Sequence, residues 1–513
     1  MGKKYFCLLM IVSQLLFFSC KKVLIEPVSS ITDANYWKTT DEFVAFNNGI
    51  YSALRTNVPR LWDLGSSRSD EFDRNGFGGL SVYDVTRAME GTLNADFPYV
   101  TAFGGFYKTI NQINLLIEKT ISTGILTAKD KNNFLGQAYG MRAFFYFHLL
   151  RSYGDIVINK EPTTSFDINQ LAKAASKAAD VMKFIKEDID SSASRFGADY
   201  SFSAGKKIYW SKAATLILKS EVYLWSAKQM GGGIADATVA KAALTEVQTN
   251  IPKLKLLPNF KDVLALDNKD NDEIIFTVRY QLNECIFFTN SPTPVDANWW
   301  LRVLSRQACE LYYDSIENRK INSATDYVGN EQGTYGMSVK NATFWRFSNQ
   351  DSRKQASLKG AYKLVDGKYQ LYGVYVSKYP YQVIAGQRYL LSDFTIYRYA
   401  DLLLMLAEAK SMLGEDPDNE INQVRQRAYG ANFEMAIQGY PNQPGDDDIN
   451  EVLLNERLFE FVAEGKRWYD LRRFGKEYVF KYTTTKKEYQ LLWPIDKTAL
   501  TNNRDLVQNP GYQ

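Results

Sequence analysis

Apolar side chains recur every three or four residues along much of this chain, which is the spacing of amphipathic helices. In residues 33–54, apolar side chains from Phe43 to Leu54 form one such face, and Thr40 and Asp41 suit a helix start. The pattern therefore predicts a mainly α protein. The same spacing predicts three helix pairs, in residues of about 103–154, 173–228 and 397–430.

Small residues lie on the predicted contact faces of these helices. Gly136, Ala138, Gly140 and Ala143 lie in the second helix of the first pair, where a neighbouring helix can approach closely. Antiparallel helix pairs with such faces are typical of tetratricopeptide-like proteins, although no strict repeat period is visible. We therefore expect tetratricopeptide-like helix pairs arranged as an α-α superhelix.

Two regions lack helical spacing. Residues 61–100 are rich in Gly, Asp and Asn between aromatic residues, which is typical of long surface loops. Residues of about 251–396 are also irregular, and alternating apolar positions within them predict short strands at 271–280 and 367–380. We expect this insertion to form a loop-rich face with a few short strands on a single body that spans residues 36–513.

The N-terminal residues have the features of a targeting segment. Lys3 and Lys4 precede an apolar run over residues 6–18, which is shorter than the roughly 20 residues that a bilayer requires. We therefore expect a signal peptide over residues 1–19, which is removed from the mature protein.

Ser19 and Cys20 follow this run and resemble the site at which bacterial lipoproteins are cut and acylated. The position three residues before the cysteine, usually aliphatic, holds Phe17. We expect a lipid on Cys20 and a tether over residues 20–35, with the lipid as the only membrane anchor. A plain secretory signal with an incidental cysteine is the alternative.

The composition is that of an ordinary globular protein, with 513 residues of which 45% are hydrophobic and 23% charged. The formal net charge of +3 falls to +1 when Lys3 and Lys4 are removed with the signal peptide. Such a balanced charge gives no support to nucleic-acid binding, so we expect no nucleic-acid partner.

Cysteine and histidine usage gives no support to a metal site. After removal of Cys7 and acylation of Cys20, only Cys285 and Cys309 remain, and two cysteines do not form a metal cage alone. A disulfide between them and two buried thiols are both open. The single histidine, His148, lies within a predicted helix, where we expect it to pack in the core. We expect no metal and no cofactor.

Common enzyme motifs are also missing from the sequence, since HExxH, GxSxG, GxxxxGK[ST] and GxGxxG do not occur. Carboxylate pairs for glycoside hydrolysis are harder to exclude, because Asp and Glu are plentiful. The densest set consists of Glu456, Glu460 and Glu464, which recur every fourth residue within residues 454–475. On one helix they would share a face.

That predicted helix has the features of a structural element. Asp448 suits its N-terminal cap, Gly465 suits its end, and Arg457, Lys466 and Arg467 lie among the glutamates. Neighbouring cations keep carboxylates ionised, whereas a general acid needs a raised pKa. We interpret the three glutamates as members of structural ion pairs and expect no catalytic residue.

Aromatic side chains in loops are better candidates for ligand binding. The face of such a ring stacks on the apolar C–H face of a sugar, while nearby Asp, Asn and Arg side chains hydrogen-bond its hydroxyls. The alternative for each ring is that it packs under its own loop. The candidate ligand-binding residues, chosen by position and chemistry, are Asp70, Arg74, Phe77, Trp299, Trp300 and Trp345.

Several sequence blocks, taken in order, resemble the SusD/RagB family of outer-membrane lipoproteins of Bacteroidota. The resemblance spans nearly the whole chain after the signal peptide and includes a C-terminal signature over residues 446–513. The blocks are Ser19-Cys20, YWKTTDEFVAFNNGIYSAL (36–54), YGMRAFFYFHLLRSYGDIVI (139–158), YRYADLLLMLAEAK (397–410), LNERLFEFVAEGKRWYDLRRFG (454–475), LLWPID (491–496) and LVQNPGY (506–512).

The resemblance implies a non-enzymatic binding protein with tetratricopeptide-like helix pairs and a loop-rich face. Members of the family cap a SusC-type TonB-dependent transporter at the cell surface and deliver oligosaccharides, or in some cases peptides, into it. Their ligand loops vary greatly, so the candidate residues above are not carried over from the family. Lys21 and Lys22, rather than acidic residues, follow Cys20, so that an outward-facing location rests mainly on the resemblance.

We therefore expect an outer-membrane, lipid-anchored receptor that binds an oligosaccharide or polysaccharide without cleaving it and delivers it to a SusC-type transporter. One alternative is a peptide receptor with the same partner. The other is a secreted glycoside hydrolase that uses two of the many carboxylates. The sequence leaves the identity, linkage and length of the glycan open.

Overall fold

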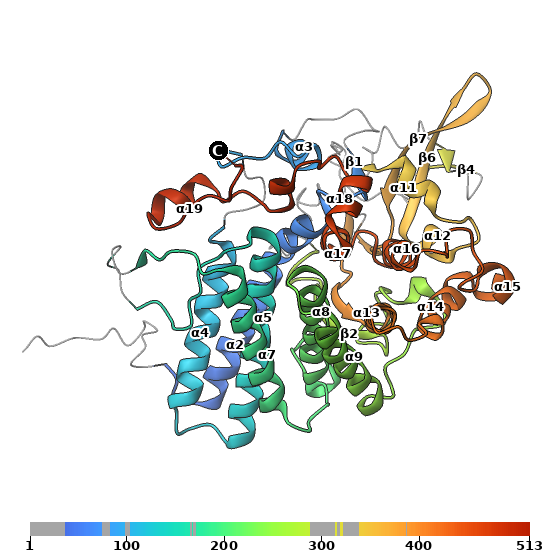
Figure 1. The fold of residues 1–513 in the computed structure, drawn as a ribbon. Coiled ribbons are helices and arrows are strands. Elements are labelled where there is room, and N and C mark those ends of the chain that lie inside the picture. Colours follow the sequence, from blue (N-terminus) through green and yellow to red (C-terminus); the bar gives the residue numbers. More distant parts are fainter. Residues whose placement is uncertain are drawn as a thin grey trace, which may run out of the picture.

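The computed structural model describes residues 36–73, 83–97, 103–164, 167, 171–287, 313–314, 319–321, 338–385 and 387–512. Long helices lie side by side in one half of the molecule, and shorter helices, strands and hairpins form most of the other half (Figure 1). The mainly α fold that the hydrophobic pattern predicts is confirmed. The signal peptide, Cys20 and the tether lie outside the described residues and remain predictions.

The predicted helix pairs form a continuous stack. α4 and α5 make up the first pair, α7 and α8 the second, and α13 and α14 the third. α5 packs against both α4 and α7, while α9 packs against both α8 and α13. This layout is the tetratricopeptide-like one. The long helices are α2 (Thr40–Ser66), α4 (Gly105–Ser122), α5 (Ala128–Tyr153), α7 (Ala178–Phe196), α8 (Lys212–Gln229), α9 (Gly233–Asn250), α13 (Tyr399–Met412) and α14 (Asp418–Tyr429).

The sequence pattern did not predict α9. Its buried face consists largely of alanines, among them Ala237, Ala240 and Ala243, with Leu244 and Val247 near the end. Alanine contrasts little with the polar residues around it, so the periodic signal is weak even though alanine is the best helix former. α9 bridges the second and third pairs, which are far apart in sequence.

The loop predicted over residues 61–100 is wrong at two places. α2 continues to Ser66 and buries Leu61, Trp62 and Leu64, and a further helix, α3, covers Tyr83–Glu90. The end of α2 is closely packed, because a Cβ added to Gly65 would lie 1.7 Å from the carbonyl oxygen of Gly465. The small residue at position 65 therefore serves backbone contact rather than a surface turn.

The small residues of α5 permit the predicted close approach of a neighbouring helix, since Oγ of Ser192 on α7 donates to the carbonyl oxygen of Gly136 at 2.6 Å. A Cβ on Gly140 would lie 2.0 Å from Nε1 of Trp210, and one on Gly136 would lie 2.9 Å from the ring of Phe196. Aromatic rings from the following helix pair therefore fill the space that the two glycines leave beside α5.

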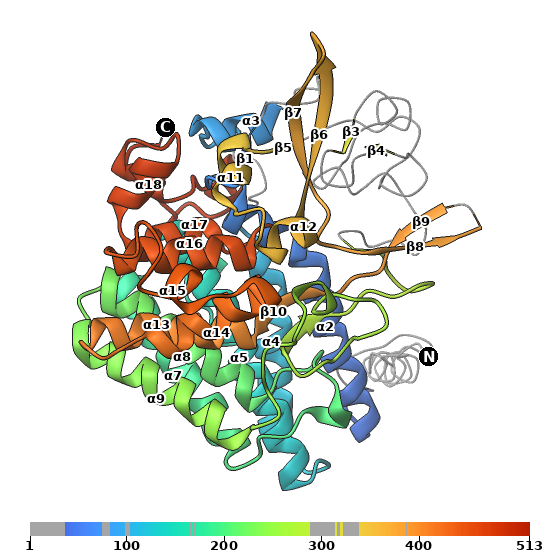
Figure 2. The same ribbon diagram turned by 90° about the vertical axis from the view of Figure 1, so that its right-hand side faces the viewer.

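The strands are antiparallel and mostly short, as expected for the loop-rich insertion. β7 lies within the predicted strand at 367–380, and β2 lies within that at 271–280. Two hairpins, β6–β7 and β8–β9, project from the body (Figure 2). The sheets have the order β1 (Phe72–Asp73), β5 (Ser338–Val339), β7 (Lys368–Val376), β6 (Leu358–Val365), β3 (Tyr313–Asp314), β4 (Arg319–Lys320); then β10 (Phe394–Arg398) with β2 (Ile274–Val278); and β8 (Tyr381–Ile384) with β9 (Gln387–Leu390).

Short helices cover the loop-rich half and the C-terminal part of the chain. None of the helices in the described part of the chain is both long enough and apolar enough to cross a membrane. The remaining α-helices, most of them short, are α11 (Asn341–Arg346), α12 (Ser352–Ser357), α15 (Met435–Gln438), α16 (Ile449–Phe461), α17 (Arg467–Phe474), α18 (Lys476–Tyr482) and α19 (Lys497–Asn502), and the 3-10 turns are η1 (Ser203–Gly205), η2 (Phe260–Asp262), η4 (Gly430–Asn432) and η5 (Glu488–Leu491).

The helix predicted around the three glutamates, from Asp448 to Gly465, is confirmed as α16 but ends earlier than predicted, at Phe461. Residues 462–466 separate α16 from α17, because Ala463 and Gly465 have positive φ values of 64° and 74°. A side chain from α2 holds this break, since Nε1 of Trp62 donates a hydrogen bond to the carbonyl oxygen of Ala463 at 2.7 Å. Glu464 consequently lies in the connection rather than on the helix.

Candidate functional site

Four of the six predicted ligand residues lie outside the described residues. Arg74, Phe77, Trp299 and Trp300 belong to this group, and their role stays a prediction. The pairing of Cys285 also remains open, because Cys285 is buried and Cys309 is not among the described residues.

Asp70 does not lie in a surface loop, so the prediction of its exposure is wrong. Its side chain is only 4% exposed, and its carboxylate accepts hydrogen bonds from Arg467 at 2.7 and 2.9 Å and from Arg346 at 2.8 Å. Burial by itself would raise the pKa of Asp70, but the two guanidinium groups lower it to about 2. The carboxylate therefore holds α17 and α11 together and does not face solvent.

Trp345 is exposed, as expected, although it lies on the short helix α11 rather than in a loop. Its side chain is 55% exposed and packs edge-on against Phe344, with ring centroids 5.1 Å apart. Nζ of Lys354 lies 5.1 Å from its ring centroid. An aromatic ring held in this way offers apolar surface to a ligand. Its binding role stays a prediction.

The three glutamates around α16 lie in a buried network of ion pairs, here called the α16 network. Their cationic partners come from α12, the end of β10, α14 and the segment after β7. The members are Glu273, Glu456, Glu460 and Glu464 with Arg353, Lys378, Arg398, Arg425 and Arg427, through the pairs Arg353–Glu456 (2.9 Å), Arg425–Glu456 (2.8 Å), Arg398–Glu464 (3.0 Å), Lys378–Glu464 (2.5 Å), Arg398–Glu273 (2.8 Å), Arg427–Glu273 (3.1 Å), Arg398–Glu460 and Arg427–Glu460.

The interpretation of these glutamates as structural ion pairs is confirmed. One expected cation, Lys466, lies within ion-pair distance of Glu464, whereas Arg457 pairs elsewhere. Arg457 pairs with Asp470 at 2.8 Å, and Lys466 lies 3.9 Å from Glu464 while it binds Asp401 at 2.6 Å. Burial would raise the pKa of Glu464, but the surrounding cations lower it to about 2. Despite burial, neighbouring arginines also lower the pKa of Glu460, so these two carboxylates stay ionised, which does not suit a general acid.

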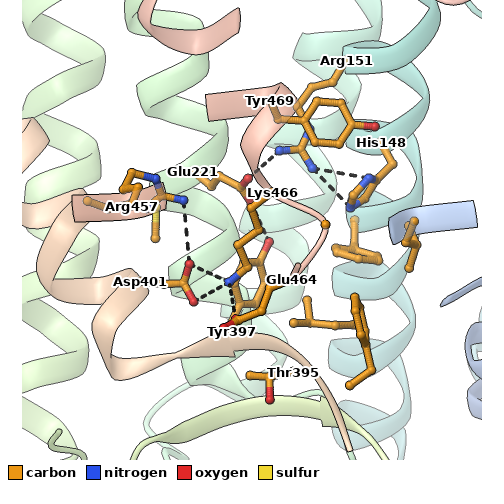
Figure 3. A pocket seen from close by; sticks show the side chains of 16 residues that line it. His148, Arg151, Glu221, Thr395, Tyr397, Asp401, Arg457, Glu464, Lys466 and Tyr469 are labelled. Atoms are coloured by element: carbon orange, nitrogen blue, oxygen red, sulfur yellow. Dashed lines mark hydrogen bonds and ion pairs between the residues drawn. The ribbon is translucent and has the colours of Figure 1, made fainter. Parts of the chain in front are cut away.

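A small buried cavity beside this network brings together residue types found in active sites (Figure 3). Arg151 lies 2.5 Å from Glu221, and the hydroxyl of Tyr397 donates to Glu221 at 2.8 Å. On the other side, Lys466 contacts Asp401 at 2.6 Å. These groups come from α5, α8, β10, α13 and the 462–466 connection, so tertiary packing alone assembles them.

His148 lines the same cavity and is a core residue, as predicted. Its ring packs against Phe144 with centroids 4.6 Å apart and against Tyr469 at 5.6 Å. Burial and then the nearby Arg151 guanidinium lower the pKa of His148 well below its usual value. The neutral ring nitrogen Nε2 lies 3.2 Å from Nη2 of Arg151, a distance that suits acceptance of a hydrogen bond.

The volume of this cavity determines what it can hold. Its volume is about 40 Å³. Ligand pockets hold roughly 300–1,000 Å³, whereas one water molecule takes up about 30 Å³. The cavity therefore suits one ordered water and not a sugar ring. Within the described residues, no group of three or more His, Cys, Asp or Glu side chains has the arrangement of a metal site.

A larger pocket lies at the surface between α2, residues 206–209 and the end of β2, and we call it the α2–β2 pocket. Its volume is about 480 Å³, within the range of ligand sites of roughly 300–1,000 Å³. It is lined by Asn48, Tyr51, Ser52, Leu54, Arg55, Lys206, Ile208, Tyr209, Thr277, Val278, Arg279, Gln281 and Glu284.

Ion pairs form much of the polar wall of this pocket. Arg55 pairs with Glu284 at 2.7 Å, and Arg279 pairs with Asp393 at 2.7 Å and with Asp270 at 2.8 Å. Burial raises the pKa of Asp270, but the Arg279 guanidinium lowers it below its usual value overall. The ion pairs therefore hold Arg55 and Arg279 in fixed positions in the wall.

The sequence did not point to the α2–β2 pocket. Its residues come from three segments far apart in the chain, so that no local motif marks it. The available signal was the polar stripe of Asn48, Ser52 and Arg55, which recur at helical spacing on α2 opposite the apolar face. Such a stripe is also the ordinary solvent face of a helix.

Two family models match the chain. Residues 280–483 match the SusD family, and residues 44–224 match a family described as starch-binding associating with outer membrane. Together these segments cover both the helical half and the C-terminal half of the molecule.

Solved structures and a characterised relative extend this similarity. B. fragilis NanU is 42% identical, with 95% of this chain and 100% of that chain covered and a TM-score of 0.87. A SusD superfamily protein from Bacteroides vulgatus is 38% identical, with 93% and 100% covered and a TM-score of 0.84. The starch-binding protein SusD of Bacteroides thetaiotaomicron is 32% identical over 132 residues, which are 24% of this chain and 22% of that one.

Proposed function

The chain belongs to the SusD/RagB family, and from this premise we propose that it is a cell-surface lipoprotein that binds a glycan and delivers it uncleaved to a SusC-type TonB-dependent transporter. The observation that carries the proposal is the relationship over nearly the whole chain, in both sequence and fold. The ligand class comes from the starch-binding description of the family that matches residues 44–224 and from the starch-binding relative.

Surface chemistry at Trp345 supports glycan binding. A sugar ring has an apolar C–H face, which stacks on an exposed aromatic ring, and hydroxyls, which need donors and acceptors nearby. Trp345 supplies the ring, and the buried Lys354 side chain lies against that ring and supports it. The other predicted ligand residues, Arg74, Phe77, Trp299 and Trp300, remain part of the proposal.

Binding without cleavage is supported by the state of the carboxylates. Glycoside hydrolysis needs one carboxylic acid with a raised pKa close to a second carboxylate and an open site between them. The densest carboxylates of this chain are buried in the α16 network, and the pKa of Glu464 is lowered to about 2. The cavity beside them holds about 40 Å³, which leaves no room for a sugar.

The membrane location rests on Cys20 and on the outer-membrane description of the matched family. Replacement of the cysteine, Cys20→Ser, removes the acylation site. We expect the variant to move from the membrane fraction to the soluble fraction, whereas the wild-type protein sediments with the outer membrane. Equal sedimentation of both proteins would contradict the lipid anchor. The transporter partner is tested by co-purification of the wild-type protein from solubilised outer membranes.

The ligand class is tested with the mature protein and a panel of polysaccharides and peptides. We expect at least one polysaccharide to retard the protein in affinity electrophoresis without release of reducing ends. Release of sugar products would contradict the receptor function and support a glycoside hydrolase. If only peptides bind the protein, the ligand is a peptide and the proposed glycan is wrong.

The position of the site is tested with Trp345→Ala. Loss of one stacking ring should weaken polysaccharide binding by about fivefold, or ~1 kcal/mol. Ile234→Ala is the matched control, because Ile234 is 59% exposed on α9 and belongs to no proposed site. Equal affinities of the two variants would remove Trp345 from the site.

A further inference from the structure

The α2–β2 pocket has no part in the function as argued so far, yet it has the size and composition of a binding site. Its volume of about 480 Å³ is open at the surface, where Asn48, Ser52, Lys206, Gln281 and Glu284 are exposed. Its floor is apolar, with Leu54, Ile208 and Val278. A concave, partly apolar surface with a few convergent polar groups is the usual form of a small-molecule site.

Tyr209 provides this pocket with a rigid aromatic wall. Its ring packs edge-to-face against Tyr51, with centroids 5.2 Å apart. The Tyr51 hydroxyl in turn donates to Oε1 of Gln137 at 2.6 Å and accepts from the backbone N–H of Trp210 at 2.9 Å. Because the Tyr51 hydroxyl is fixed by two hydrogen bonds, the Tyr209 ring packs on a fixed neighbour before any ligand arrives, which lowers the entropic cost of binding.

The rim offers donors and acceptors side by side. Nη2 of Arg55 donates to Oε1 of Glu284 at 2.7 Å, and Nη1 donates to the backbone carbonyl of Arg279 at 3.3 Å. The guanidinium still has further N–H groups, and the Glu284 side chain is 46% exposed. Asn48 adds an amide that both donates and accepts. Adjacent donors and acceptors of this kind match hydroxyl groups, which need both.

Charge favours a neutral ligand. Every cation at the pocket already lies near a carboxylate: Arg55 on Glu284, Arg279 on Asp270 and Asp393, and Lys206 at 3.5 Å from Asp270. An anionic ligand would have to compete with these carboxylates, whereas a hydroxyl adds hydrogen bonds without displacing a charge.

The backbone does not favour a peptide strand at this place. Peptides that bind in extended form pair with an open strand edge. β2 pairs with β10 on one edge, and on the other edge the N–H of Thr277 donates to the carbonyl oxygen of Lys207 at 3.0 Å. At the level of the pocket both edges of β2 are therefore occupied.

We propose that the α2–β2 pocket binds a neutral pyranose unit of a glycan, with the sugar ring against Tyr209 and its hydroxyls on Arg55, Glu284 and Asn48. The inference rests on the proposed function as a glycan receptor. It adds a binding site that shares no residue with the surface around Trp345, so that a long glycan or two separate chains contact the protein at two places.

The test measures binding of single sugars to the mature protein by saturation-transfer NMR. The probes are glucose, galactose, mannose and N-acetylglucosamine, with glucuronic acid, inorganic phosphate and triglycine as members of other ligand classes. We expect at least one neutral sugar to bind, and we expect Tyr209→Ala and Glu284→Gln each to raise its Kd by about tenfold. Ile234→Ala, on α9, should leave the Kd at the wild-type value.

The two variants keep the test decisive. Tyr209 is partly buried, so thermal unfolding followed by circular dichroism checks that Tyr209→Ala is folded. If Tyr209→Ala does not fold, Glu284→Gln, which changes an exposed side chain, carries the test. The proposal is overturned if both folded variants bind the sugar as the wild type does, or if only glucuronic acid, phosphate or triglycine binds.

The outcome also separates this proposal from the proposed function. If the wild-type protein and Tyr209→Ala retain a polysaccharide equally and no single sugar binds, the receptor function stands and the pocket proposal is wrong. If the wild-type protein retains no polysaccharide and binds no sugar, both are wrong.

Discussion

The α16 network and the α2–β2 pocket are made of the same residue types, yet they serve different purposes. Both pair Arg with carboxylates, and a tyrosine hydroxyl or ring lies beside each. In the network the Glu460 side chain is fully buried, whereas the Glu284 side chain in the pocket is 46% exposed. The adjoining cavities differ in volume, about 40 Å³ against about 480 Å³.

The difference teaches that access to water, and not residue type, separates a structural ion pair from a binding surface. A buried carboxylate that loses its partner stays in a low-dielectric environment and pays the desolvation penalty in full. At the surface, water or a ligand hydroxyl replaces the lost partner at little cost. Substitutions in the two regions should therefore have very different effects on stability.

The largest effect is expected at the centre of the network. Arg398 contacts Glu273, Glu460 and Glu464, so Arg398→Met leaves three buried carboxylates short of a partner. We expect the free energy of unfolding, measured by urea denaturation, to fall by about 3–5 kcal/mol. The matched control is Lys241→Met, which removes a partly exposed pair with Glu415 and should cost about 0–1 kcal/mol. Similar losses in the two variants would contradict the comparison.

A backbone contact next to the network should have the next largest effect. Gly65→Ala places a methyl group against the carbonyl of Gly465, which lies in the 462–466 connection that positions Glu464. We expect a loss of about 3 kcal/mol in the free energy of unfolding, because the backbone at this point has no room to move. Gly49→Ala on the same helix meets no atom within 4 Å. This control should raise stability by up to about 1 kcal/mol.

The pH dependence should report a buried carboxylate directly. The pKa of Asp70 falls from 3.8 to about 2 in the folded protein. Because the folded-state pKa lies below the unfolded one, this carboxylate stabilises the fold above pH 4, and the stabilisation is lost as pH falls towards 2. Between pH 5 and pH 2 the wild-type protein should lose about 2 kcal/mol more than Asp70→Asn. Parallel urea-denaturation profiles of the two proteins would show that Asp70 is not bound as described.

The smallest effect is expected in the pocket. Glu284→Gln removes the charge that pairs with Arg55, but both side chains are accessible to water. We expect the free energy of unfolding to change by less than about 1 kcal/mol, while sugar binding weakens. A loss of stability as large as that of Arg398→Met would show that the Arg55–Glu284 pair is a structural ion pair like those of the α16 network, and would contradict the comparison.

Much of the fold could be predicted from local sequence. The three-to-four spacing marks α4, α5, α7, α8, α13 and α14, because an amphipathic helix must bury one face whatever its neighbours are. The pattern did not predict α9, because its buried face is mostly alanine. It also did not predict the end of α2, because Gly65, Ser66 and Ser67 resemble a turn. At the end of α2 packing therefore overrode the local sequence, whereas α9 has high helix propensity and lacked only a clear apolar period.

The candidate site was less predictable. Trp345 is exposed as expected, but Asp70 is buried beneath two arginines from positions 346 and 467. A polar run such as the one around Asp70 has the same composition in a surface loop and in a buried ion-pair cluster. The α2–β2 pocket had no local motif, since its walls come from three distant segments.

By itself the sequence determined the helix pairs, the short strands of the loop-rich half and the family to which the chain belongs, because these depend on periodicity and on ordered blocks of residues. Only the tertiary structure decided which charged residues form structural ion pairs and which face the proposed ligand. Glu464 and Glu284 are both glutamates beside basic residues, and what distinguishes them is whether distant segments exclude water around them or leave a pocket open.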